Sequence, residues 1–311
     1  MNLVFMGTSE FAVPALEKLA ASTTHRVMAV VTQPDRPQGR GLEVRSSPVK
    51  EAAVAKQMHL FQPENVNDYE FLRELRALSP DVIVVVAYGQ KLSNDILSLP
   101  RWCCANIHPS LLPRFRGPEP VARAILRGET VGGVCIVKVV EKMDAGPILG
   151  VTRVPIPPDA TTSEFEATLA PIGADLLVEV LDAIAAQTMI ELPQNEREAS
   201  YAPKFEKNDG RIDWRKPAAR VKDFVRALQP FPVAFTFHNR ARLAVWKVAV
   251  ASGARSNQRP GTISAVEKDR VRVACGEGEV ALLEVQPENK KRMSAAEWVN
   301  GFQPKGGEAL G

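Results

Sequence analysis

Two polar side chains, Asn106 and His108, stand two positions apart in the run CANIH. The run predicts a short strand, and side chains on a strand alternate between its two faces. Asn106 and His108 are therefore expected to point to one side, while Ile107 points into the core. The strand should end at Pro109, because proline cannot continue a central ladder. The pair is thus predicted at the carboxyl end of a strand, where open α/β sheets place their ligand crevices.

An amide, an imidazole and a carboxylate together suit acyl transfer to a nitrogen. Asparagine can donate to a developing oxyanion without carrying charge, and histidine can hold or pass a proton near neutrality. Asp144, in the connector EKMDAGPIL, could orient the histidine or accept a proton from an attacking amine. An aspartate before Ala-Gly-Pro is also a common turn residue, so its place near His108 stays open. These residues predict acyl- or carbonyl-type transfer.

A proline-rich connection in which His108 only caps a strand is the alternative interpretation. The coincidence of an asparagine, a histidine and a loop stiffened by Pro109, Pro113 and Pro118 favours a site instead. A nucleophile is missing, because Ser110 lies in the run PSLLP and not in a G-x-S-x-G elbow. The sequence contains no HExxH, EF-hand or P-loop motif, and we expect no metal.

The order of apolar runs predicts an α/β fold whose first part is a Rossmann-like, mostly parallel sheet. Residues 81–89, DVIVVVAYG, have the continuous β-branched character of a central parallel strand buried on both faces. A strand at residues 3–6 leads through Gly7 into a helix from about residue 10, with Thr8 or Ser9 as its cap. The turn has one glycine where the dinucleotide fingerprint needs three, which opposes an NAD enzyme.

Five short strands with glycine-bearing turns follow between residues 233 and 285, and they predict a small OB-like antiparallel β-barrel. Residues 188–209 are polar and aperiodic, which is typical of a linker. We therefore expect a catalytic domain at 1–187, a linker at 188–209 and a C-terminal domain at 210–311.

A second loop carries three arginines above the same sheet edge. Residues 33–48, QPDRPQGRGLEVRSSP, contain three prolines and two glycines, and we expect no regular structure there. Its length exceeds that of most α/β connections, and long ordered loops are often functional. Arg36, Arg40 and Arg45 could clamp a phosphate backbone, although a variable surface loop with incidental charge is the alternative.

Charge is distributed unevenly over the 311 residues, whose net charge is +3. From Asn208 onward there are 18 Lys and Arg against 11 Asp and Glu, whereas the preceding part carries 21 against 25. A basic second part predicts contact with a polyanion, and an ordinary solvated basic surface is the alternative. The composition, 45% hydrophobic and 24% charged, is that of a globular protein.

Apolar runs, the N-terminal residues and the cysteines indicate in which cellular compartment the protein is expected. No apolar run approaches the roughly 20 residues of a membrane span, so no membrane contact is expected. The first strand begins at Leu3, which leaves no room for a signal peptide before it. The four cysteines show no zinc-type spacing, and reduced thiols in a cytoplasm are the simplest account.

The motifs NIHPSLLPRFRG and MDAGPIL resemble those of the formyltransferases that use 10-formyltetrahydrofolate. The resemblance extends over nearly the whole chain and is greatest to the members that act on tRNA, through LVFMGTSEFAVPAL, PDRPQGRGLEV with SSPVK, YAPKFEKNDGRIDW and RALQPFPVAFT. Two positions depart from those members. Pro109 stands where they more often have glycine, and Pro118-Glu119-Pro120 stands where Ala-Ala-Pro is frequent.

The resemblance implies specific roles. Asn106 and His108 would stabilise the formyl oxyanion, and Asp144 would orient the site and help to take the proton from the methionyl amine. The co-substrate 10-formyltetrahydrofolate would lie in the sheet crevice. Its implied contacts are the backbone near Tyr88, Gly89 and Gln90, and the loop residues Ser110, Leu111, Leu112 and Pro113.

The acceptor implied by the resemblance is methionyl initiator tRNA, used in translation initiation by a cytoplasmic monomer. The residues implied in tRNA binding are Arg36, Arg40 and Arg45 in the loop and Lys290, Lys291 and Arg292 near the C-terminus. Two alternatives stay open. A formyltransferase for a small amine, such as glycinamide ribonucleotide or an amino sugar nucleotide, would not need the basic second part. A non-catalytic nucleic-acid-binding protein would not need Asn106 and His108 on one face.

Overall fold

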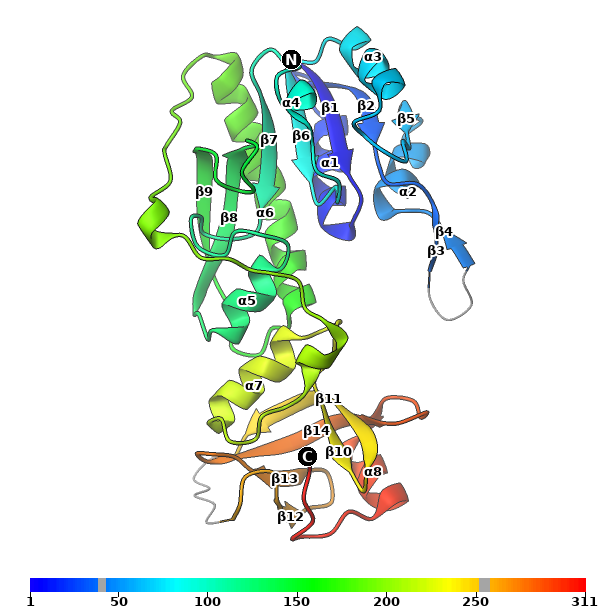
Figure 1. Cartoon of the computed structure of the whole chain (residues 1–311), viewed down its shortest axis with the longest axis vertical. Helices are drawn as coiled ribbons and strands as arrows, with labels where there is room; N and C mark the ends of the chain where they lie inside the picture. The colour runs from blue at the N-terminus through cyan, green and yellow to red at the C-terminus, as the bar shows by residue number, and fades with distance from the viewer. Residues whose placement is uncertain (39–42, 252–257) are drawn as a thin grey trace. The chain divides into compact units, whose positions relative to one another are not determined.

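The computed structural model describes residues 1–38, 43–251 and 258–311 (Figure 1). Its internal contacts divide the chain into two compact units. The first contains residues 1–120, 131–155 and 166–202, and the second contains residues 121–130, 156–165 and 203–311. The boundaries at 187 and 209 that the sequence suggests stay a prediction.

The first unit is built on a seven-stranded sheet of order β5-β2-β1-β6-β7-β8-β9. The strands are β1 (Asn2–Gly7), β2 (Arg26–Val31), β5 (Leu60–Phe61), β6 (Val82–Val86), β7 (Cys103–His108), β8 (Val131–Lys138) and β9 (Ile148–Pro155). The five from β5 to β7 are parallel, whereas β8 and β9 run antiparallel to their neighbours. The predicted Rossmann-like, mostly parallel sheet is confirmed.

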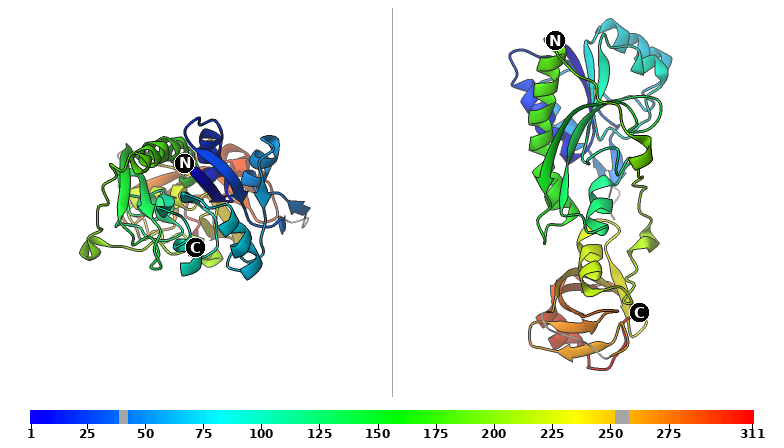
Figure 2. Two further views of the ribbon diagram at one scale, coloured as in Figure 1. Left: turned by 90° about the horizontal axis from the view of Figure 1, so that it is seen from above. Right: turned by 90° about the vertical axis from the view of Figure 1, so that its left-hand side faces the viewer.

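Helices cover both faces of this sheet (Figure 2). They are α1 (Val13–Ala20), α2 (Pro48–Ala55), α3 (Tyr69–Ala77), α4 (Asn94–Leu97) and α6 (Thr162–Ala185), with 3-10 turns η1 (Glu10–Ala12) and η2 (Glu196–Glu198). Alternate side chains of β1 pack against the helices on the two opposite faces of the sheet. Leu3 and Phe5 pack with α1 and α6, while Val4 and Met6 pack with α3 and α4. None of the described helices is both long and apolar enough to cross a membrane.

One local expectation was wrong, and a second was only partly right. The segment 33–48 contains a small hairpin, β3 (Arg36–Gln38) paired antiparallel with β4 (Glu43–Arg45). Pro37 does not prevent pairing, because a two-stranded ribbon has only edge strands, on which proline is tolerated. The helical segment does begin at Glu10, but as the 3-10 turn η1, and the α-helix starts at Val13. Ser9 occupies the N-cap position of η1, although its side chain makes no capping hydrogen bond. Thr8 instead donates to the carbonyl of Tyr88 at 2.8 Å.

The second unit is a curled antiparallel sheet of order β10-β11-β14-β13-β12, with β15 beside β14. Its elements are most of α5 (Pro120–Leu126), η3 (Lys207–Gly210), α7 (Ala218–Ala227), β10 (Phe235–His238), β11 (Ala241–Val250), β12 (Ile263–Val266), β13 (Val271–Ala274), β14 (Glu279–Pro287), β15 (Met293–Ser294) and α8 (Ala295–Phe302). The C-terminal tail bonds both edges of the sheet, through Ile263 N to Glu308 O and Gly311 N to Phe237 O. This half-barrel confirms the predicted OB-like second part.

Close contact between α6 and the sheet depends on a glycine. A Cβ atom added at Gly173 would lie 2.8 Å from Ile107 Cγ2 and 3.1 Å from Val134 Cγ2. Both partners are buried strand residues in the core. The lack of a side chain at Gly173 therefore sets the height of α6 above β7, the strand that carries Asn106 and His108.

We expect Gly173→Val to lower the free energy of unfolding by about 2 kcal/mol, because overpacking a well-filled core displaces its neighbours. Chemical denaturation measures the effect. Ala167→Val, at an exposed position of the same helix, is the matched control and should cost only about 0.5 kcal/mol from helix propensity. Equal stability of the two variants would refute the proposed close contact.

Candidate active site

Strand β7 presents its side chains as the alternation predicts. Ile107 is 3% exposed and packs in the core cluster that contains α6. Cys104, which shares a face with Asn106 and His108, packs in the other core cluster, on the opposite side of the sheet. The strand ends at His108, immediately before Pro109. Asn106 and His108 therefore lie on one face at the carboxyl end of the strand.

The side-chain amide of Asn106 is available for a ligand. Asn106 is partly exposed, and within the described part of the chain its amide has no hydrogen-bond partner. An amide offers two N–H donors and one carbonyl acceptor. A neutral donor is thus ready at the strand end, without an internal bond that a ligand would have to break.

His108 is buried and held by a backbone carbonyl. Its Nε2 lies 3.0 Å from the carbonyl oxygen of Phe115, and a carbonyl oxygen can only accept, so Nε2 carries the proton. Its Nδ1 lies 3.7 Å from Oδ2 of Asp144. The side chains of His108 and Asp144 are 5% and 15% exposed. The structure therefore brings the two sequence-predicted residues together in a largely dry environment.

The direction of the strands alone would not place Asp144 beside His108. β8 runs antiparallel to β7 and ends at Lys138, opposite Ala105, which is about 10 Å along the strand from His108. The connection from β8 to β9 must therefore fold back along β7. It is held in place by the N–H of Gly117, which donates to Asp144 Oδ2 at 2.8 Å. Asp144 itself has a φ of +51°.

Three further residues around Asp144 were not found from the sequence. Gln194 donates to the carbonyl oxygens of Asp144 and Gly146, each at 2.7 Å. Arg116 and Glu196 lie beside Gln194. Gln194 and Glu196 belong to the polar stretch that the sequence suggests as a linker, where no periodicity marks them. Arg116 offered one signal, because an arginine needs hydrogen-bond partners when it is buried, but its burial is known only from the structure.

The residues after β6 offer main chain rather than side chains. Tyr88 is 2% exposed and packs in the core, and burial raises the pKa of its hydroxyl. The side chain of Gln90 accepts from Val66 N at 2.8 Å. Gly89 has a φ of +90°, which few other residues adopt. The backbone of this turn lies beside the end of β7, since β6 and β7 are paired neighbours.

The loop after His108 is likewise turned inward. Ser110 Oγ donates to the carbonyl of Arg114 at 2.9 Å. Leu112 is buried against Cys135 and Val137 of β8, and the Leu112–Pro113 peptide is cis. Leu111 and Pro113 are partly exposed. Between Ser110 and Pro113 the one polar side chain is therefore engaged within the loop, and the other polar groups are those of the backbone.

The predicted basic residues lie in two separate units. Arg36 and Arg45 are directly opposed across the hairpin β3–β4, and Arg36 lies 3.6 Å from Glu64. Arg40 lies outside the described residues. Lys290, Lys291 and Arg292 are exposed in the second unit. Arg292 bonds Glu284 at 2.6 Å and stacks over Trp246 at 4.7 Å.

Comparison with known proteins matches these features to one family. Residues 1–181 match the family described as "Formyl transferase", and residues 204–303 match "Formyl transferase, C-terminal domain". A methionyl-tRNA formyltransferase of Roseiflexus sp. (strain RS-1) is 44% identical, over 100% of this chain and 95% of the relative. That of Acetivibrio thermocellus is 41% identical over the full length of both chains. This chain belongs to the methionyl-tRNA formyltransferase family.

Membership in the methionyl-tRNA formyltransferase family confirms the predicted enzyme class, one that transfers a formyl group. The fold recurs among solved structures. WlaRD, a sugar 3N-formyl transferase crystallised in the presence of dTDP and 5-N-formyl-THF, matches with a TM-score of 0.68 at 14% identity, over 94% of this chain and 99% of that one. At such identity the likeness concerns the fold alone.

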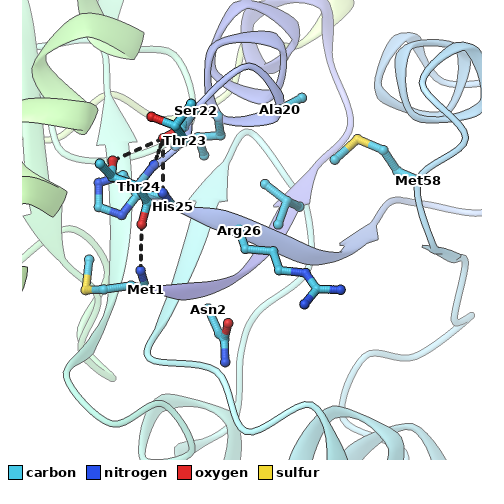
Figure 3. Close-up of a pocket in the computed structure, with 11 residues that line it drawn as sticks. Met1, Asn2, Ala20, Ser22, Thr23, Thr24, His25, Arg26 and Met58 are labelled. Carbon is cyan, nitrogen blue, oxygen red and sulfur yellow. Dashed lines mark hydrogen bonds between the residues drawn. The ribbon is translucent and has the colours of Figure 1, made fainter.

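A cavity elsewhere in the first unit is unrelated to these residues. It has a volume of about 430 Å³ and lies at the amino ends of β1 and β2 (Figure 3), between Met1, Thr24, Arg26 and Met58. Its walls are tied by a bond from the amino group of Met1 to the carbonyl of Thr24 at 2.9 Å. Because the parallel strands all run away from it, this cavity lies at the end of the sheet opposite to His108.

The contact between His108 and the carbonyl of Phe115 predicts which ring nitrogen of His108 carries the proton. In its neutral form His108 should be the Nε2–H tautomer, because the carbonyl oxygen of Phe115 can only accept. Long-range ¹⁵N–¹H correlation spectra of the labelled protein distinguish the tautomers. The exposed His59 is the internal control and should show a mixture of both. An Nδ1–H tautomer for His108 would contradict the geometry.

Proposed function

We propose that this chain transfers the formyl group of 10-formyltetrahydrofolate to the amino group of methionyl initiator tRNA, as a cytoplasmic monomer. The juxtaposition of Asn106, His108 and Asp144 at one strand end carries the chemistry. The 44% identity to a methionyl-tRNA formyltransferase along the whole chain supports the acceptor. The matches to the formyl transferase family over residues 1–181 and to its C-terminal domain over residues 204–303 support a catalytic domain followed by a second domain that could contact the acceptor.

The residues present fit a folate co-substrate. When bound, 10-formyltetrahydrofolate supplies the formyl group. A flat pterin needs close backbone donors and acceptors, which the turn at Tyr88–Gln90 can offer because Gly89 has no side chain in the way. The inward-turned loop from Ser110 to Pro113 would form the other wall. The WlaRD structure, with 5-N-formyl-THF present, supports folate binding by this fold.

The roles proposed for Asn106, His108 and Asp144 follow from the hydrogen-bond donors and acceptors that each side chain has available. Asn106 would donate to the formyl oxygen as it gains negative charge, which a neutral amide does without desolvating a second ion. His108, fixed by the carbonyl of Phe115, would stabilise the same oxygen when protonated at Nδ1. Asp144 has one oxygen engaged by Gly117, and its Oδ1 has no partner among the described residues. That oxygen would accept the proton that the attacking amine loses.

The hairpin supports a polyanionic acceptor. Arg36 and Arg45 are directly opposed across the hairpin and both are exposed. Two guanidinium groups on one exposed ribbon could contact neighbouring phosphates of a nucleic-acid backbone. Arg40 would belong to the same surface, and Lys290, Lys291 and Arg292 would contact the tRNA through the C-terminal unit, consistent with its excess of basic residues.

An acceptor assay tests the proposal. The purified chain is mixed with 10-formyltetrahydrofolate and, in parallel, with methionyl initiator tRNA, methionyl elongator tRNA, glycinamide ribonucleotide or an amino sugar nucleotide. Formylmethionyl initiator tRNA and tetrahydrofolate are the expected products, at a rate that falls as salt screens the phosphate contacts. Formylation of a small amine but not of the tRNA would overturn the proposed acceptor.

Asn106→Asp should lower kcat about 10²- to 10³-fold, because it replaces an oxyanion donor with an acceptor of the same size. KM for both substrates should change little. Asn94→Asp makes the same chemical change at an exposed position at the start of α4, and it should retain wild-type activity. An Asn106→Asp variant within threefold of the wild-type kcat would remove Asn106 from the mechanism.

A further inference from the structure

The turn that carries Asp144 adopts a backbone conformation that it would not choose alone. A φ of +51° is unusual for a residue with a side chain. Such conformations persist only where surrounding contacts over-determine them. The side-chain contact with Gly117 fixes one carboxylate oxygen, but it does not hold the main chain of the turn. Another group must do so.

Gln194 supplies that contact. Its Nε2 donates to two carbonyl oxygens, those of Asp144 and Gly146, each at 2.7 Å. Both hydrogens of the amide are therefore used, one on each side of Ala145. Two short bonds to one turn hold both its position and its twist, whereas a single bond would allow it to rotate.

The orientation of the Gln194 amide is itself fixed. Its Oε1 accepts from Arg116 Nε at 3.1 Å and from Arg116 Nη2 at 2.8 Å. Because an arginine can only donate, a flipped amide would place NH₂ against the guanidinium and lose all four bonds. Arg116 therefore selects the one orientation in which Gln194 can donate to the Asp144 turn.

Arg116 is in turn fixed by Glu196. The guanidinium side chain is 0% exposed, and its Nη1 and Nη2 donate to the two oxygens of Glu196 at 3.2 and 2.8 Å. Hydrogen bonds from Arg116, then from Lys142, hold the pKa of Glu196 at about 2, so its charge persists at neutral pH. Lys142, at the start of the same turn, bonds Glu196 at 2.7 Å.

The segment that supplies Gln194 and Glu196 is anchored at both ends. We call residues 192–202 the strap; it follows α6 and passes outside β9 (Figure 1). Leu192 exchanges two main-chain bonds with Ile148 at the start of β9. At the other end Arg116 N donates to Ser200 O at 2.8 Å, and Ala202 N donates to Arg116 O at 2.7 Å. The strap is therefore a fixed frame and not a free connection.

We propose that Gln194 is the positioning residue that holds Asp144 against His108, and that Arg116 and Glu196 serve this reaction by fixing the amide of Gln194. The inference rests on the proposed role of Asp144 as proton acceptor. Gln194 touches no reacting atom, so its contribution is to the geometry of Asp144. A carboxylate that must receive a proton from an attacking amine loses rate steeply with displacement, and a shift of about 1 Å can cost about 10²-fold.

Gln194→Glu is the sharpest test, because it keeps the size of the side chain and its acceptors for Arg116 but removes both donors to the turn. We expect kcat of the folded enzyme to fall about 10²-fold, with KM for the folate and for the tRNA within about twofold. Tm should also fall, because a carboxylate oxygen then faces two carbonyl oxygens. Gln194→Leu, which removes donors and acceptors together, should show the same split between kcat and KM. A merely structural contact would lower Tm as well but would leave the kcat of the folded fraction unchanged.

Asn195→Ala is the matched control. Asn195 is the next residue of the strap, and its side chain bonds only Arg197 N and Glu198 within the described chain, not the Asp144 turn. Its loss should leave kcat at the wild-type value. Reduced kcat in Asn195→Ala equal to that of Gln194→Glu would overturn the proposal, because the effect would then belong to the strap as a whole.

A double-mutant cycle separates this inference from the function on which it rests. In an Asp144→Asn background, Gln194→Glu should cause no further loss of kcat, since the carboxylate that it positions is already gone. Independent, multiplicative losses would overturn the positioning role. If Asp144→Asn alone retained activity, the proposed role of Asp144 would fail, whatever the result at Gln194. If Gln194→Glu and Gln194→Leu both retained kcat while Asp144→Asn lost it, only the positioning role would fail.

Discussion

The antiparallel pairing of β7 with β8 is the constraint on which the candidate site depends. It directs the connection that carries Asp144 away from the strand end where Asn106 and His108 lie. The connection reaches His108 only by folding back, in a conformation that is unfavourable for a residue with a side chain. Every other contact around the site, from Gly117 N–H to the amide of Gln194, opposes that local cost.

The hydrogen bonds that hold the Asp144 turn involve buried polar groups, and such groups must find partners within the protein. A buried guanidinium such as Arg116 is costly unless its donors are satisfied, and here Gln194 and Glu196 satisfy four of its bonds. Hydrogen bonds depend on the direction of donor and acceptor, whereas apolar contacts do not. Hydrogen bonds from a fixed fork select one rotamer of Gln194 and hence one position of the turn, whereas hydrophobic packing would tolerate several.

The walls of the crevice follow a different rule. Tyr88 and Leu112 are packed in the core, and Gln90 and Ser110 bond within the protein, so a ligand at these segments would meet mainly main-chain groups. Sequence motifs identify such segments by their glycines and prolines, because those residues control backbone shape. They do not reveal which backbone groups point toward a ligand, since that depends on turns fixed by neighbours such as Thr8 and Val66.

The sequence by itself determined features that depend on neighbouring residues along the chain. Strand alternation put Asn106 and His108 on one face, Pro109 ended the strand, β-branched runs marked the central sheet, and the excess of basic residues marked the second part. The tertiary structure decided which distant residues meet. Asp144 reaches His108, and Gln194 reaches Asp144 across 50 positions, through pairings whose register no local pattern encodes. The hairpin at Arg36–Arg45 was missed for the same reason, because two three-residue strands are defined by each other and not by their own composition.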